Sequence, residues 1–186
     1  LTGGGDLTIT DGAVQAYDAL TVNSLTIADA TTSITFGGAI ASTAAIDVDS
    51  GGTIVLNAAI TGATTVALDS TGVTTVAAAG DMTGTGAITF GADKSGTLTT
   101  SGDITTTNDN VTFTRGVTLG GNVTVDTGGD SAGNILFSST IATGGNDLTL
   151  DAGTAGNVTL SGALTGGGDL TITDGAVLSF NDITVD

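Results

Sequence analysis

The chain has 186 residues and a formal net charge of −17 at pH 7, because 19 acidic residues, all Asp, face only Lys94 and Arg115. It contains no Pro, Cys, His, Trp or Glu. Without His and Cys, the usual catalytic triads and the imidazole or thiolate metal sites are excluded. The scarcity of cations excludes neutralisation of nucleic-acid phosphates and predicts repulsion from anionic membranes.

The remaining composition favours short strands joined by tight turns. Gly accounts for 31 residues and Thr is commoner still. Thr and Val favour extended chain, whereas Gly and Asp favour turns. The hydrophobic fraction of 39% excludes an acidic disordered tail, and no apolar run is long enough to cross a bilayer as a helix. We therefore expect an all-β chain with a buried core and no insertion of this segment into a membrane.

The chain begins with a sequence that it later repeats. The segment LTGGGDLTITDGAV of Leu1–Val14 returns unchanged at Leu164–Val177. We interpret residues 1–163 as one long repeat unit and residues 164–186 as the start of the next copy, within a single continuous domain of residues 1–186.

A shorter period lies inside this unit. Residues 31–86 hold alternating segments such as Ile34–Phe36 and Ile54–Leu56, and a regular series then starts at Ile88. Its triplets recur at a nearly constant interval: Ile88–Phe90, Val111–Phe113, Ile135–Phe137 and Val158–Leu160. Two further strand-like series run in step with it, so the pattern predicts three short strands in every ~23 residues. The long repeat would then hold seven such units.

A period of this length predicts a repeat architecture in which each unit buries its apolar side against its neighbours. The connections are too short for crossover helices, so we predict a parallel β-helix, a solenoid with three strands per coil. Alternation within each strand places one column of side chains inside, formed by Phe90, Phe113, Phe137 and Leu160. A tandem β-sandwich repeat is the alternative fold, because it also produces Thr- and Val-rich strands at short spacing.

A second column precedes the same strands and consists of Asn110, Asn134 and Asn157. A side-chain amide both donates and accepts, so stacked Asn residues can bond to their copies in neighbouring coils. The alternative is that Asn occurs at these positions only because it tolerates the backbone angles of turns, without side-chain bonds between coils.

The Gly-Gly-Asn/Asp-Leu-Thr-Leu and Asn-Val-Thr-Leu units resemble the repeats of filamentous-haemagglutinin-type adhesins and of autotransporter passenger domains. That resemblance implies a right-handed parallel β-helix, secretion, and adhesion or scaffolding at the bacterial cell surface. It implies an extracellular fibre whose partners are further repeats of the same chain or copies of itself end to end, together with surface glycans or other cells.

Candidate chemistry is sparse. Asp147 and Asp169 follow glycine-rich turns and are candidate calcium ligands, although the nonapeptide spacing of calcium-binding rolls is missing. The alternative is that they cap turns and keep the surface soluble. We expect no catalysis and no obligatory cofactor. The alternatives are a passive stalk, an S-layer or sheath repeat with calcium-stabilised turns and, more remotely, a polysaccharide-active β-helix enzyme that uses paired Asp carboxylates.

Overall fold

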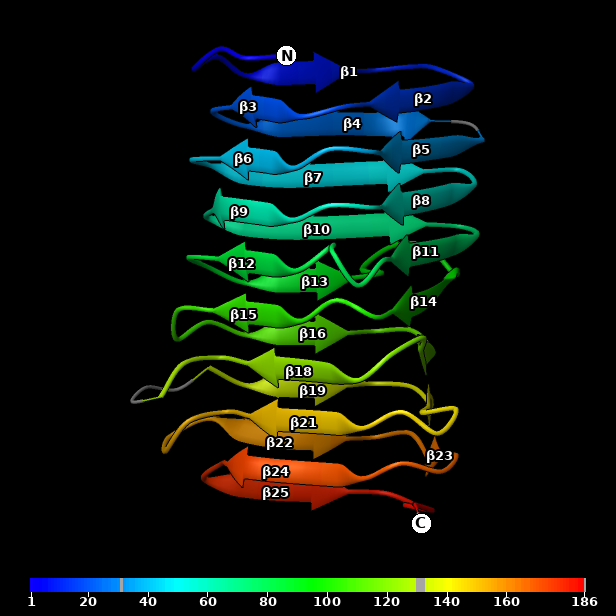
Figure 1. The fold of residues 1–186 in the computed structure, drawn as a ribbon, viewed down its shortest axis with the longest axis vertical. Coiled ribbons are helices and arrows are strands. Elements are labelled where there is room, and N and C mark those ends of the chain that lie inside the picture. Colours follow the sequence, from blue (N-terminus) through cyan, green and yellow to red (C-terminus); the bar gives the residue numbers. More distant parts are fainter. Residues whose placement is uncertain (31, 130–132, 186) are drawn as a thin grey trace.

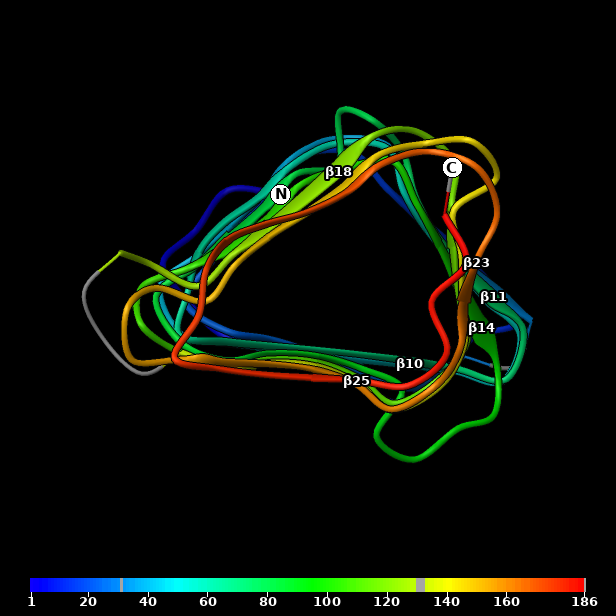
Figure 2. The same cartoon turned by 90° about the horizontal axis from the view of Figure 1, so that it is seen from below.

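The computed structural model describes residues 1–30, 32–129 and 133–185, and these residues form strands and no helix. The strands build three parallel sheets that stack coil on coil into a rod (Figure 1). Seen along its axis, the rod is a rounded triangle with one sheet on each side (Figure 2). The predicted fold class is confirmed: the chain is a β-solenoid with three strands per coil.

Successive strands visit the three sheets in turn. Sheet I has nine strands: β1 (Leu7–Ile9), β4 (Leu25–Ala30), β7 (Ala45–Ser50), β10 (Thr65–Ser70), β13 (Ile88–Phe90), β16 (Val111–Phe113), β19 (Ile135–Phe137), β22 (Asn157–Leu160) and β25 (Val177–Phe180). Sheet II has eight: β2 (Val14–Tyr17), β5 (Ser33–Phe36), β8 (Thr53–Leu56), β11 (Val73–Val76), β14 (Thr97–Thr100), β17 (Val117–Leu119), β20 (Ile141–Ala142) and β23 (Leu164–Thr165). Sheet III also has eight: β3 (Leu20–Val22), β6 (Ile40–Ser42), β9 (Ile60–Ala63), β12 (Met82–Gly84), β15 (Ile104–Thr106), β18 (Val123–Asp126), β21 (Leu148–Asp151) and β24 (Leu170–Asp174).

The pairing register of neighbouring strands follows the sequence repeat wherever that repeat can be recognised. Val111 pairs with Ile88 on one side and with Ile135 on the other, as the recurring triplets predict. The parallel pairing of strands one coil apart excludes the sandwich alternative, in which antiparallel neighbours would pair.

The coil length differs from the prediction near the N-terminus. Leu7 pairs with Leu25, so the first coil is shorter than the one from Ile88 to Val111. The average over the rod is about 21 residues per coil, less than the sequence period predicts. The reason is that the early corners between strands are shorter. Seven coils per long repeat is therefore wrong: β1 and β24, which carry the same sequence, are 23 strands apart in the described chain, and three strands make a coil.

The core is a set of stacked columns inside the triangle. Phe90, Phe113 and Phe137 are fully buried. The ring centroids are 5.2 Å apart between Phe90 and Phe113 and 4.2 Å apart between Phe113 and Phe137, with interplanar angles of 1° and 10°. Leu160 continues the column beside Phe137. Ring stacking adds to the hydrophobic gain of burial.

The corner between sheets I and II requires glycine. Gly52, Gly72 and Gly96 follow one another there in consecutive coils, and the Gly72 N–H donates to the Gly52 carbonyl oxygen at 2.7 Å. A Cβ atom at Gly96 would collide with the Gly72 carbonyl oxygen. The backbone can turn this tightly only because these positions have no side chain.

Phe113→Ala should lower the free energy of unfolding by roughly 3–5 kcal/mol, because it removes the central ring of the column and leaves a cavity. Thr112→Ala changes the outward-facing neighbour and should have a far smaller effect. Urea unfolding of both variants measures the difference. Equal losses would contradict the assigned facing of β16.

Candidate functional site

The column of Asn residues lies at the corner that leads into sheet I. The Oδ1 of Asn110 accepts from the backbone N–H of Asn134 at 2.8 Å and from its Nδ2 at 3.0 Å. The Oδ1 of Asn134 accepts from the backbone N–H of Asn157 at 2.9 Å. Each of these two side chains thus bonds to the next coil, and the backbone ladder of sheet I is extended around the corner.

Asp147 and Asp169 occupy the equivalent corner before sheet III. The two oxygens of Asp147 accept from the Asp169 N–H and the Asn122 Nδ2, both at 3.0 Å. Asp103 makes the same kind of contact two coils earlier, where its carboxylate accepts from the Thr124 N–H at 2.7 Å. The structure therefore brings Asp147 and Asp169 together through a backbone donor, which is the role of a turn cap. Within the described ranges, no three acidic side chains are grouped so as to hold a metal ion.

A second group of charged side chains lies at the corner between sheets I and II. We call it the cationic corner, since it holds both basic residues of the chain; it comprises Asp29, Asp49, Asp69, Asp93, Lys94 and Arg115. The loop between β13 and β14, which carries Asp93 and Lys94, projects from the rod beside this corner (Figure 2).

Arg115 is buried at this corner and forms an ion pair there. Its Nη2 lies 2.9 Å from Asp69 Oδ1, and each side chain is only 6% exposed. Its Nη1 donates to the Ser70 carbonyl oxygen at 2.7 Å. The side chain passes Gly91, where a Cβ atom would collide with Arg115 Nε, and so reaches back across two coils. Burial lowers the pKa of Arg115, and Asp69 opposes that shift.

Lys94 covers the outside of the same corner. Its Nζ lies 3.3 Å from Asp29 Oδ1, in a pair whose partner Asp29 is largely exposed. Between the two ion pairs, burial raises the pKa of Asp49, whereas Lys94 lowers it and the carboxylates of Asp47, Asp69 and Asp93 raise it. Lys94 and Arg115 therefore partly neutralise the stacked Asp residues of this corner. Their ion pairs connect coils that are distant in sequence.

Sequence reasoning missed this cluster. Its one signal is the spacing of Lys94 and Arg115, which is about one coil and places the two cations in adjacent turns. The columns of Phe and Asn could be seen because a residue type repeats. An ion pair between different residues in different coils leaves no such pattern.

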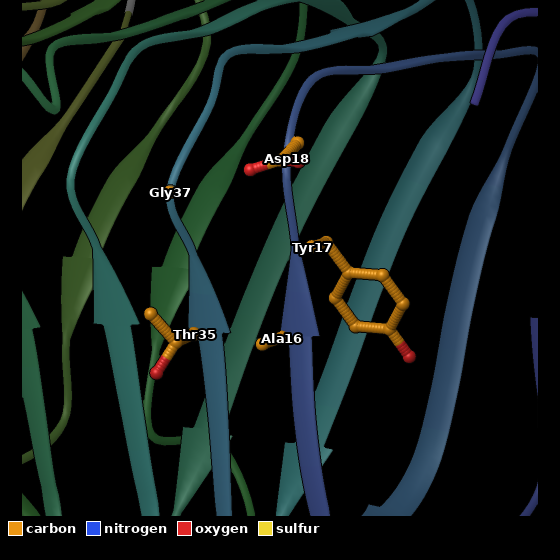
Figure 3. A pocket seen from close by; sticks show the side chains of 5 residues that line it. All are labelled: Ala16, Tyr17, Asp18, Thr35 and Gly37. Atoms are coloured by element: carbon orange, nitrogen blue, oxygen red, sulfur yellow. The ribbon is translucent and has the colours of Figure 1, made fainter.

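A shallow hollow of about 240 Å³ lies near the N-terminal end, where β2 and β5 end. It is lined by Ala16, Tyr17, Asp18, Thr35 and Gly37. Figure 3 shows the Tyr17 ring and the Thr35 side chain pointing to opposite sides of the strand pair. Polar groups do not converge there as they do in a specific ligand site.

Comparison with known proteins gives no relative. No family model matches the chain, and neither a curated protein nor a solved structure matches it. Among the described residues, no helix is long and apolar enough to cross a membrane.

Arg115→Met should destabilise the protein by roughly 3–5 kcal/mol, because it leaves the Asp69 carboxylate buried without its partner. Changing both residues, Arg115→Met with Asp69→Leu, should recover most of this loss, since the uncompensated charge is gone. Lys94→Met is the control for a more exposed pair and should cost at most about 1 kcal/mol. Denaturant unfolding measures all three; a double variant no better than Arg115→Met would argue against the buried pair.

Asp49→Asn should raise the melting temperature at pH 7. The pKa of Asp49 is higher in the folded state than its ordinary value of 3.8, so its ionisation opposes folding. That penalty is relieved as the pH falls through the folded pKa, and the advantage of the variant should shrink with it. Asp109→Asn, at an exposed position outside this cluster, is the control and should leave the melting temperature nearly unchanged. A variant as stable as the parent at pH 7 would show that Lys94 fully compensates Asp49.

Proposed function

We propose that this chain is a structural segment of a long repetitive fibre on the surface of a bacterium, where it extends coil on coil and performs no catalysis. The observation that carries the proposal is the openness of both ends of the rod. In the described part of the chain, each of the three sheets finishes at either end in an edge strand that is covered at most by an isolated bridge. A free parallel edge is a template for the next strand.

The end coils also expose apolar side chains that middle coils bury. Leu178 and Phe180 on β25 are 47% and 40% exposed, whereas Phe137, two coils earlier in the same sheet, is 1% exposed. At the other end, the inward-facing Leu7 and Ile9 on β1 are only partly buried, whereas Leu25 and Ile27, their partners one coil later, are 0% and 1% exposed. The natural occupant of such an end is another coil of the same kind, from a further repeat in the chain or from a second copy.

The surface charge supports an extended fibre. With a net charge of −17, lateral contact between rods is opposed wherever carboxylates meet. The strands of sheet II are the exception, because their sequences contain no charged residue. An outward row on this sheet is neutral and includes Thr35, Val55, Thr75, Thr99 and Thr118. Adhesive contact with neutral polymers such as surface glycans would fall on this face, because no charge has to be desolvated there.

A passive stalk that carries a separate binding domain outward is the second candidate. The hollow beside Tyr17 has no convergent polar groups, and this favours a spacer over a segment that selects its own ligand. The two candidates share the rod and its open ends, and they differ in whether purified protein binds to cells or glycans through sheet II.

The 186-residue protein should elongate into filaments at micromolar concentration, with chains stacked head to tail. Phe180→Lys places a charge on the inward side of the end coil and should suppress elongation. Ser179→Lys, the matched control on the outward side of the same strand, should not. Light scattering and electron microscopy follow the assembly. A compact monomer that never elongates, or equal suppression by both changes, would overturn the proposal.

A further inference from the structure

The duplicated sequence lies on two different faces of the rod. In the first copy, Leu7–Ile9 forms β1 in sheet I, and Val14 starts β2 in sheet II. In the second copy, the identical Leu170–Ile172 lies in β24 of sheet III, and Val177 starts β25 in sheet I. Both strands of the second copy are therefore displaced by one sheet.

The packing shows why the same sequence fits both places. On sheet I, Leu7 and Ile9 pair with Leu25 and Ile27 of the next coil. On sheet III, Leu170 and Ile172 pair with Leu148 and Leu150. In both settings alternate aliphatic residues point inward and Thr points outward, so the strand meets the same environment. A strand fits a sheet of a solenoid when apolar inward residues alternate with polar outward residues, and many sequences meet this requirement.

The displacement has a geometric consequence for repeated copies. The step from β1 to β24 is 23 strands, which is one strand short of eight complete coils of three. We infer that, in the repetitive fibre proposed above, each long repeat unit is rotated by one third of a turn relative to the unit before it. The rise per unit is ~37 Å at the usual ~4.8 Å per coil.

This rotation decides how the fibre meets a partner. The cationic corner and the neutral face of sheet II would appear on each of the three sides of the rod in turn and return to the same side after three units. A partner that recognises the neutral face, such as a second fibre of the same chain, could therefore attach from three directions. Whole-turn repeats would instead align the face along one side and favour flat, two-dimensional association.

The rotation can be tested within the 186-residue chain, since it contains both copies and no native Cys to interfere with labelling. Two doubly spin-labelled variants are compared, Thr8→Cys with Ser179→Cys and Thr8→Cys with Thr171→Cys. All three positions are exposed and outward-facing. An excess of unlabelled protein suppresses distances between stacked chains.

Thr8 and Ser179 both lie on sheet I and should be separated by the axial rise alone, ~38 Å for eight coils. Thr8 and Thr171 occupy the same place in the duplicated sequence but lie on sheets I and III. A step across the rod adds to their axial rise of ~37 Å, so their separation should be the longer one. The order of these two distances in pulsed electron paramagnetic resonance supports the inference. Equal distances, or a shorter one for Thr8 and Thr171, would overturn it.

The inference rests on the proposed repetitive fibre, yet its test does not require fibres. If the protein never elongates but the Thr8 to Thr171 distance is the longer one, the fibre proposal fails and the one-third turn stands. If filaments form and the order of distances is reversed, the fibre proposal stands and the rotation fails.

Discussion

Each strand in the middle of this rod obtains its backbone hydrogen bonds from the coil above it and the coil below it. A three- or four-residue strand cannot persist alone, because an isolated strand has no hydrogen-bonding partner and buries little apolar area. Stacking at the strand spacing solves both problems at once: it completes the ladder, and it places Phe113 between Phe90 and Phe137. The same requirement leaves the two end coils incompletely covered. The exposed apolar ends and the proposed elongation both follow from this one dependence on the neighbouring coil.

The corners decide where polar groups can lie. Inside the triangle there is room mainly for aliphatic and aromatic columns, and the flat faces carry mostly small outward residues. Carboxylates and amides therefore gather at the corners, where Asn134 and Asp147 use their side chains to bond to adjacent coils. The cationic corner is the strongest case, since Arg115 is buried there against Asp69. Such a pair adds little net stability compared with apolar packing, but removal of one partner is costly because the other charge stays buried.

The sequence allowed the prediction of fold class, strand number per coil and register wherever a residue type recurs. Phe90, Phe113 and Phe137 reveal one column because only stacking demands the same large ring at each step. Residues 31–86 lack such a marker, and Thr and Val alternation there fits any register, so the short N-terminal coils could not be counted. The one-third turn between the two copies of the duplicated sequence could not be predicted for the same reason. It depends on the number of strands between the copies, which composition and periodicity do not determine. In the sequence, Arg115 is only an isolated cation. Its ion pair could not be predicted, because the side chain passes Gly91 of a neighbouring coil, and this contact depends on how the coils stack.

The most direct test of coil stacking is a set of backbone nuclear Overhauser contacts in isotopically labelled protein that carries Phe180→Lys to limit assembly. Parallel in-register pairing predicts contacts from the backbone of Thr112 to that of Thr89, one coil before it, and to that of Leu136, one coil after it. The same spectrum should show no antiparallel pairing between β16 and β17, which follow each other in the chain but lie on different sheets. Contacts between those two strands, with none from Thr112 to Thr89 or Leu136, would contradict the solenoid.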